Sequence, residues 1–339
     1  MANPTIEIVP GLRQVIVPIS DSPLGSVNVY LIEDAAGPIL IDTAWRTDEA
    51  TEAIAAALAE RGAQVSDLSQ IVLTHAHPDH AGLAATFREA SGAPIALHPA
   101  DWPMADPARR VDEANLSTSA QWFRRNGIPA DEQAGTRARR SMGDRNPPFV
   151  PDRTLADGEE LVLGRFTFRV IWVPGHARGQ VCLYDERARV LVSADHVLPA
   201  ISPNVGIYGP DDGRPLDDYL ASLARVRDLP AEIVLPGHGA AFTGLAERVD
   251  WLAAHHEERL DEIRAALAPL AGADTRPATA FDLCHDLTWI GGTVHFSKLS
   301  PFQQSMAIAE TIAHLEVLRR RGEATSDEGE ARITWRKQG

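Results

Sequence analysis

Short runs of alternating apolar and polar residues dominate the start of the chain. Residues 6–19 alternate in this way, and residues 26–33 and 38–42 are two further β-rich runs separated by a glycine-containing turn. A period of two is typical of strands with one buried face. The pattern predicts β-structure here, followed by an alanine-rich helix over residues 47–62 that ends at Gly62.

Further buried strands, each closed by a polar turn, recur along the chain. The first of them covers residues 71–73, and the helix predicted after it ends at about residue 90. The others are residues 94–98, a hairpin over 158–174, and runs at 181–185, 189–196 and 232–236. Strands that alternate with helical segments are typical of layered α/β proteins.

Residues 99–150 break this pattern. Tryptophans and other large apolar residues are interleaved there with several arginines, and Asn146-Pro-Pro closes the segment. We interpret it as a helical insertion between strands. Its arginines either form a solvated helix face or belong to a lid whose cations meet an anionic substrate.

The strand pattern ends at residue 244. Helical periodicity at residues 245–270, 279–287 and 301–321 is followed by a small hairpin over 323–335. Three helices and a hairpin resemble a winged-helix arrangement, so we predict two domains, at residues 1–244 and 245–339. The second is either an accessory module that completes a core or a homodimer face, or a module that binds nucleic acid or another partner. The third helix has no basic stripe apart from Arg319-Arg-Arg at its end, which favours the accessory module.

Four residues that can bind metal follow the strand at residues 71–73. His75 and His77 are two positions apart, so in an extended or tightly turned segment they lie on one side and can hold one ion. Asp79 and His80, at the start of the following helix, can turn towards a neighbouring point. Chance clustering of histidines does not readily explain such density at a strand-to-helix junction. This loop is therefore predicted to supply ligands for two metals.

Three more strands end in a possible ligand: His176, Asp195 and His238. The ends of such strands meet at the edge where α/β proteins assemble their sites, and the glycines beside the two histidines allow sharp turns. Asp42 also ends a strand. It either caps the next helix or accepts a hydrogen bond from a metal-bound histidine.

The candidates divide into two sets of ligands. One set is His75, His77 and His176, the other is Asp79, His80 and His238, and Asp195 could bridge them. Nitrogen and carboxylate ligands suit Zn²⁺, with Fe or Mn as alternatives, and the lack of thiolates disfavours a closed structural zinc. Each metal keeps an open position, which indicates catalysis.

The overall composition narrows the partners and the compartment. The 339 residues are 44% hydrophobic and 23% charged, and the formal net charge of −15 disfavours broad contact with nucleic acid or an anionic membrane. The two cysteines, Cys182 and Cys284, have apolar neighbours and are predicted to be buried free thiols. The first residues do not resemble a signal peptide and no run approaches a membrane span, so we predict a cytoplasmic protein.

The combined motifs resemble the ligand set of the metallo-β-lactamase superfamily, over residues 10–245. They are His75-Ala-His77-Pro-Asp79-His80, Gly175-His176, Ser193-Ala-Asp195 and Pro236-Gly-His238. The resemblance implies an α/β fold, the αββα sandwich of that family, in residues 1–244. The helical tail is similar to that of the glyoxalase II-like and LACTB2-like hydrolases.

The resemblance also implies a mechanism. Two divalent metal ions would activate a bridging hydroxide, which attacks a small ester, thioester or lactone. We assign catalytic functions to Asp79, which would orient the hydroxide and pass on its proton, and to Asp195, which would bridge the ions. Asp42 and His196 are candidates for supporting hydrogen bonds, and Tyr208 either donates to an oxyanion or packs. His196 could equally form a hydrogen bond only within its own loop.

Departures from the family pattern limit the substrate. Common zinc β-lactamases carry Cys in place of Asp195, so antibiotic hydrolysis is not expected as the native activity. Glyoxalase II-like proteins often have a second histidine where this chain has Gln180, which leaves thioester specificity open. The rival predictions are a phosphodiesterase or ribonuclease that uses the same two-metal site, a binding module built on the C-terminal domain, and a metal-bound scaffold without activity.

Overall fold

The computed structural model describes residues 5–19, 24–105, 113–129, 148–268 and 277–338. Two compact units are present. The first comprises the described residues of Met1–Arg110, Met142–Pro203 and Ser222–Val249, and the second those of Val111–Ser141, Asn204–Ala221 and Asp250–Gly339. The predicted domain division at residue 244 stays a prediction.

The first unit contains a seven-stranded sheet in the order β1 to β7. Its strands are β1 (Thr5–Val9), β2 (Leu12–Pro18), β3 (Ser26–Ile32), β4 (Ile39–Ile41), β5 (Gln70–Val72), β6 (Ile95–Leu97) and β7 (Arg153–Thr154). Neighbouring strands are antiparallel from β1 to β4 and parallel from β4 to β7. Parallel pairing places the ends of β4 and β5 at one edge of the sheet, where Asp42 and the histidine loop begin.

A five-stranded sheet in the order β12-β11-β10-β9-β8 forms the second layer. Its strands are β8 (Glu160–Leu163), β9 (Phe166–Trp172), β10 (Val181–Asp185), β11 (Val190–Ala194) and β12 (Ile233–Pro236). Only β11 and β12 pair in parallel. Since β9 and β11 both run antiparallel to β10, the strands β9, β11 and β12 end at the same edge.

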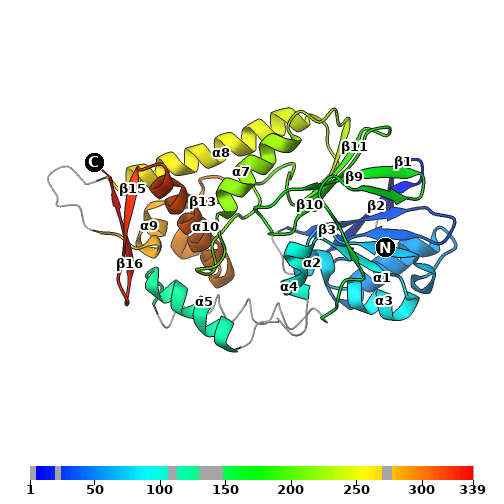
Figure 1. The fold of residues 1–339 in the computed structure, drawn as a ribbon, viewed down its shortest axis with the longest axis horizontal. Helices are drawn as coiled ribbons and strands as arrows, with labels where there is room; N and C mark the ends of the chain where they lie inside the picture. Colours follow the sequence, from blue (N-terminus) through cyan, green and yellow to red (C-terminus); the bar gives the residue numbers. More distant parts are fainter. Residues whose placement is uncertain (1–4, 20–23, 106–112, 130–147, 269–276, 339) are drawn as a thin grey trace. The chain divides into compact units, whose positions relative to one another are not determined.

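The two sheets pack face to face through apolar side chains. Tyr30, Ile41 and Val72 of the first sheet join Phe168 and Val192 of the second in one buried cluster. A second buried cluster fills the opposite face of the first sheet, beneath its helices. Figure 1 shows α1 and α3 along that face. The sandwich of two sheets expected from the sequence is thus confirmed.

Helices and short 3₁₀ segments connect the strands of the first unit. They are α1 (Asp48–Ala59), η1 (Val65–Asp67), α2 (Pro78–Ala81), α3 (Ala84–Ser91), η2 (Pro99–Asp101) and α4 (Trp102–Ala105). The Thr47 side chain caps α1, and Asp48 and Glu49 in its first turn complement the helix dipole. The end of α7 (Pro215–Val226), from Ser222 onwards, also belongs to this unit, and its Arg225 donates to the Trp172 carbonyl at the end of β9 (2.6 Å).

The second unit is mainly helical. Its helices are α5 (Glu113–Arg125), most of α8 (Leu245–Ala266), α9 (Ala280–Asp286), η3 (Phe296–Lys298) and α10 (Pro301–Arg320). Two short antiparallel pairs of strands accompany them: β13 (Thr288–Trp289) pairs with β14 (Val294–His295), and β15 (Ala324–Glu328) pairs with β16 (Ile333–Lys337). Ser300 and Gln303 form a capping box at the start of α10. The predicted helical C-terminal region is confirmed, and its terminal hairpin is β15–β16.

The insertion predicted at residues 99–150 is helical in much of its described part. In the predicted insertion at 99–150, η2, α4 and α5 are helical, while residues 106–112 and 130–147 lie outside the described part of the chain. Both cysteines are buried free thiols, as predicted, and burial raises their pKa values. In the described ranges, no helix is both long and apolar enough to cross a membrane.

Candidate metal centre

Three histidine rings meet where two loops of the first unit approach each other. His75 and His77 lie between β5 and α2, and His176 lies on the loop after β9. The Nε2 atom of His75 is 3.0 Å from Nδ1 of His77, which is 2.9 Å from Nε2 of His176. A tetrahedral ion with bonds of about 2.0–2.1 Å holds its ligand nitrogens about 3.3 Å apart. We call these residues the three-histidine group, and their spacing is close to what one zinc ion requires.

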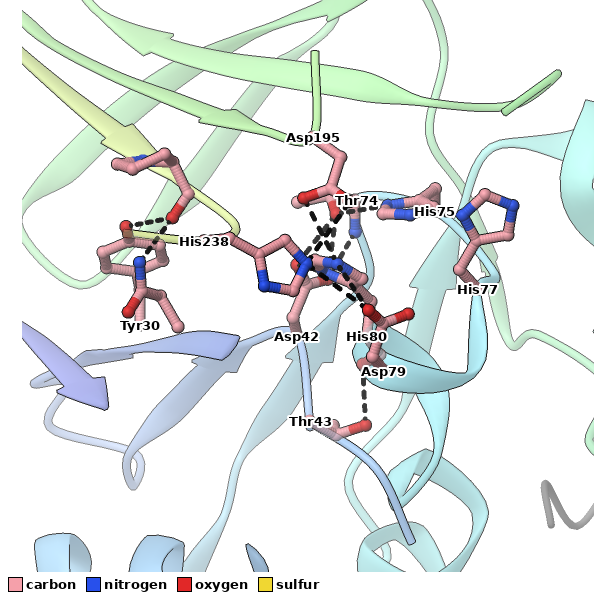
Figure 2. A network of polar contacts seen from close by, with 12 residues as sticks. Tyr30, Asp42, Thr43, Thr74, His75, His77, Asp79, His80, Asp195 and His238 are labelled. Carbon is pink, nitrogen blue, oxygen red and sulfur yellow. Dashed lines mark hydrogen bonds and ion pairs between the residues drawn. The ribbon is translucent and has the colours of Figure 1, made fainter. Parts of the chain in front are cut away.

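A second group combines one carboxylate with two imidazoles. Asp79 and His80 belong to α2, and His238 follows β12. Nε2 of His238 is 3.4 Å from Oδ2 of Asp79, and Nε2 of His80 is 4.0 Å from the same oxygen. Figure 2 shows the two side chains of α2 and that of His238 lying close together. They are close enough for one ion to contact all three.

Asp195 lies between the two groups. Its Oδ2 atom is 3.5 Å from Nε2 of His176 and 3.5 Å from Nε2 of His238, and its Oδ1 atom is 3.4 Å from Nε2 of His80. Asp195 follows β11 directly, so the end of a buried strand fixes its backbone. One carboxylate therefore faces both groups, which is the position that a bridging ligand needs.

Burial keeps two members of the three-histidine group, His75 and His77, neutral. Burial, followed by repulsion from neighbouring rings, lowers the pKa of His75 well below its usual range. Burial and the neighbouring His176 lower the pKa of His77 to about 3. A neutral imidazole offers the lone pair that a metal ion binds, so His75 and His77 are suited to bind a cation at neutral pH.

The second group instead attracts positive charge. Burial opposes protonation, but Asp195, Asp42 and Asp79 together raise the pKa of His80, and Asp195 helps to raise that of His238 to about 10. Burial also opposes ionisation of Asp79, yet His80 and His238 lower its pKa to about 2. Among the described residues, Nε2 of both histidines and Oδ1 of Asp195 are buried without a hydrogen-bond partner. These features fit a divalent cation held by the group.

Asp42 orients one histidine of each group. Its carboxylate accepts a hydrogen bond from Nδ1 of His80 (2.8 Å) and another from the Thr74 hydroxyl (2.8 Å), which is 3.1 Å from Nδ1 of His75. With both Nδ1 atoms engaged, the Nε2 atoms point into the groups. The alternative prediction, that Asp42 caps the next helix, is wrong because Thr47 is the N-cap of α1.

Polar residues of β3 hold the loop that carries His238. The Asn28 amide donates to the Pro236 carbonyl (2.9 Å), as does the Tyr30 hydroxyl (2.7 Å), and Nδ1 of His238 donates to the Ser26 carbonyl (2.7 Å). Figure 2 includes Tyr30 and His238. These supports were not predicted from the sequence. The available signal was polar residues alternating with valines in a strand that is buried on both faces.

The chain is similar to known proteins over the whole of this site. Residues 22–238 match the model of the metallo-beta-lactamase superfamily. The matched segment spans most of the chain and contains every predicted metal ligand, from His75 to His238.

The chain belongs to the metallo-β-lactamase superfamily.

Similar proteins include one named as a probable metallo-hydrolase and others named as acyl-coenzyme A thioesterases. The probable metallo-hydrolase YqjP of Bacillus subtilis is 28% identical over 87% of this chain and 88% of its own length. The acyl-coenzyme A thioesterase MBLAC2 of Gallus gallus is 32% identical over 55% of this chain and 61% of its own length. Together with the superfamily match, these relatives identify the chain as a hydrolase.

A solved structure covers almost the whole chain. The metallo-beta-lactamase family protein TTHA1429 from Thermus thermophilus superposes with a TM-score of 0.81 at 34% identity, over 98% of this chain and 100% of that protein. A beta-lactamase domain protein from Burkholderia ambifaria gives a TM-score of 0.78 at 26% identity, over 99% and 96%. The similarity to these two structures therefore extends through the helical C-terminal region.

The remaining predicted site residues lie outside both ligand groups. His196 is fully buried next to Asp195, and burial lowers its pKa to about 3. The buried Gln180 amide, with its oxygen facing the Asp195 loop, accepts the backbone N–H of His196 (2.7 Å) and that of Asp195 (3.0 Å). Tyr208 belongs to the second unit, where it forms a hydrogen bond with Asn204. The functions predicted for His196 and Tyr208 stay predictions.

Proposed function

We propose that this superfamily member is a dinuclear metal-dependent hydrolase of a small acyl substrate: a thioester, an ester or a lactone. The observation that carries the proposal is the position of Asp195, whose carboxylate faces His176 of one group and His238 and His80 of the other. Two groups of ligands that share a carboxylate suit two ions that act together.

His75, His77 and His176 would hold one ion, Asp79, His80 and His238 the other, and Asp195 would contact both. Zn²⁺ suits these nitrogen and oxygen ligands best, with Fe and Mn as alternatives. When bound, the ions would supply Lewis acidity for a carbonyl oxygen and lower the pKa of a coordinated water.

Asp79 is the residue of this chain best suited to move the proton. Its side chain is 16% exposed, whereas that of His80 is fully buried, so its carboxylate can meet water. His80 and His238 lower its pKa, so it is ionised at neutral pH, and an oxygen that holds no ion would be free to accept a proton from an attacking water and pass it to the leaving group.

Thioesters are the first substrate class to test. MBLAC2 is named as an acyl-coenzyme A thioesterase, and its human form is 28% identical over 68% of this chain and 78% of its own length. The coenzyme is a large anion, and the chain carries a net charge of −15, so a coenzyme A thioester would need a local cationic contact. Smaller thioesters, esters and lactones belong in the same panel.

The test is to measure kcat/KM of purified, metal-analysed protein for acyl-coenzyme A thioesters, 4-nitrophenyl esters, lactones, bis(4-nitrophenyl) phosphate and a short RNA. We expect about two zinc equivalents per chain, the highest kcat/KM on an acyl substrate, loss of activity with chelator, and recovery with Zn²⁺. Preferred cleavage of the phosphodiester or RNA would support the rival two-metal activity instead. Full turnover after complete metal removal would overturn the proposed mechanism.

A further inference from the structure

A buried carboxylate outside both ligand groups connects the two loops that carry the three-histidine group. Asp101, the last residue of η2, is 1% exposed. Its Oδ2 atom accepts the backbone N–H of Ala76 (2.9 Å), and its Oδ1 atom accepts that of Gly179 (2.6 Å). Ala76 lies between His75 and His77, and Gly179 is three residues beyond His176.

The position of Asp101 is fixed independently of these loops. Its backbone N–H donates to the His98 carbonyl (3.0 Å), directly after β6, and the neighbouring Trp102 indole donates to the Leu97 carbonyl (3.1 Å). The carboxylate is therefore anchored to a buried strand of the first sheet. Each of its oxygens then restrains one ligand loop.

Close packing leaves this arrangement little freedom. A Cβ atom added at Gly179 would lie 2.8 Å from both Cβ and Cγ of Asp101, which is closer than such carbon atoms approach in proteins. The loop after His176 can therefore meet the carboxylate at this distance only with glycine at position 179. A side chain here would move the loop away from the His75–His77 segment.

We propose that Asp101 is a positioning residue for the three-histidine group, which sets the separation of the His75–His77 loop from the His176 loop and thereby the metal affinity of that group. The proposal rests on the proposed metal site. The three nitrogens converge to about one ligand spacing, and a shift of either loop would open it. Partners that orient metal ligands commonly contribute about 10- to 100-fold in affinity.

A merely structural buried aspartate is the alternative, and the chain offers a matched control. Asp185 is 3% exposed and also accepts two backbone N–H groups, those of Thr167 and Ala188, each at 2.7 Å. It ends β10 and restrains no ligand loop. Asp101→Asn and Asp185→Asn each turn one buried acceptor into a donor that faces a backbone N–H.

The experiment compares zinc binding by the two full-length variants with wild type, in competition with a chromophoric chelator, and records visible spectra of the Co²⁺ forms. We expect Asp101→Asn to weaken one of two zinc sites about 10- to 100-fold and to change the Co²⁺ spectrum. Asp185→Asn should lower the unfolding temperature but bind both ions as wild type does. Wild-type affinity in Asp101→Asn, or an equal loss in Asp185→Asn, would overturn the inference.

A second variant keeps the test decisive if Asp101→Asn does not fold. Gly179→Ala retains the carboxylate but forces it away from the loop, so it should weaken the same zinc site selectively; unchanged binding by this variant contradicts the inference. Failure of the proposed function is distinguishable, because wild-type protein would then bind no pair of ions. If wild type binds two ions and all variants match it, only the assignment of Asp101 is wrong.

Discussion

At the scale of single residues, the site requires a residue without a side chain next to its ligands, at Gly237. A Cβ added at Gly237 would lie 2.1 Å from Oδ1 of Asp195 and 2.8 Å from Cε1 of His80. Ala194, just before Asp195, has a φ of 45°, which is unfavourable for alanine. The backbone around Asp195 is thus held in an uncommon conformation so that its carboxylate can lie between two groups of ligands.

Asp79 gives the first residue-scale prediction. Replacing it with alanine removes the carboxylate proposed to move the proton but leaves five imidazoles and Asp195 to hold metal. We expect kcat to fall by about 100-fold or more, which is a usual contribution of general acid–base catalysis, while most of the metal stays bound. Steady-state kinetics and metal analysis of the same sample measure both quantities.

Asp228→Ala is the control for this prediction, because that side chain is 82% exposed and pairs only with a neighbouring arginine in the described structure. Its kcat should match wild type. An unchanged kcat in Asp79→Ala would exclude the proposed proton transfer, and complete loss of metal would assign Asp79 to binding alone.

At the scale of elements, the structure divides two segments that the sequence predicted to be continuous. The alternating run at residues 6–19 is two strands, because Gly11 adopts a φ of 86° and turns β1 into β2. The single helix expected after the histidine loop is divided into two helices, α2 and α3. There the His80 carbonyl accepts from the Thr43 N–H (2.6 Å) and hydroxyl (2.9 Å) rather than from the next helical turn.

Thr43 therefore gives an element-scale prediction. Thr43→Val keeps the shape of this fully buried side chain but removes the hydroxyl that donates to His80 and accepts from the Leu83 N–H (3.3 Å). We expect the free energy of unfolding to fall by about 1–3 kcal/mol, the cost of leaving buried polar groups unpaired. Chemical denaturation of both proteins measures the difference.

The same substitution at Thr51 is the control, since its hydroxyl donates only along α1, at an exposed position (2.9 Å). Thr51→Val should change the free energy of unfolding by less than about 0.5 kcal/mol. Equal losses in the two variants would mean that the break between α2 and α3 does not depend on Thr43.

At the scale of the whole molecule, the chain combines a sandwich that contains the candidate metal ligands with a second, mainly helical unit. All seven predicted ligands lie in the first unit, in the segments that follow four different strands. The second unit has its own buried polar contacts, such as that between His256 and His314 (3.1 Å). Metal binding should therefore act on the first unit and leave the second largely unaffected.

Metal removal tests this expectation. A ligand present at 100 times its Kd stabilises the folded state by about 2.7 kcal/mol, so chelation should lower the unfolding temperature by about 5–10 °C. Hydrogen exchange should accelerate around residues 74–80 and 194–196 but not in α10. Equal acceleration in α10, or no change near the ligands, would contradict the assignment of metal binding to the first unit.

The sequence by itself determined the local chemistry and the class of fold. Hydrophobic periodicity depends on neighbouring residues, so the buried strands and the C-terminal helices could be predicted from it. The histidine motif could be predicted because its residues lie within six positions of one another. The motif order was specific enough for the superfamily, which the comparison confirms. The structure brings the members of each predicted set together, but it also groups His75, His80 and Asp195 across the two sets, so the assignment of ligands to two ions stays a prediction.

Only the tertiary structure decided how those ligands are held. Asp42, Asn28 and Asp101 reach partners 32, 208 and 78 residues away in the chain, and no local pattern encodes such pairing. Their identity as supports depends on which strand ends meet at one edge and which backbone groups are buried there. The physical reason is that a buried polar atom must find a partner wherever the fold provides one, and the fold is set by packing of the whole chain.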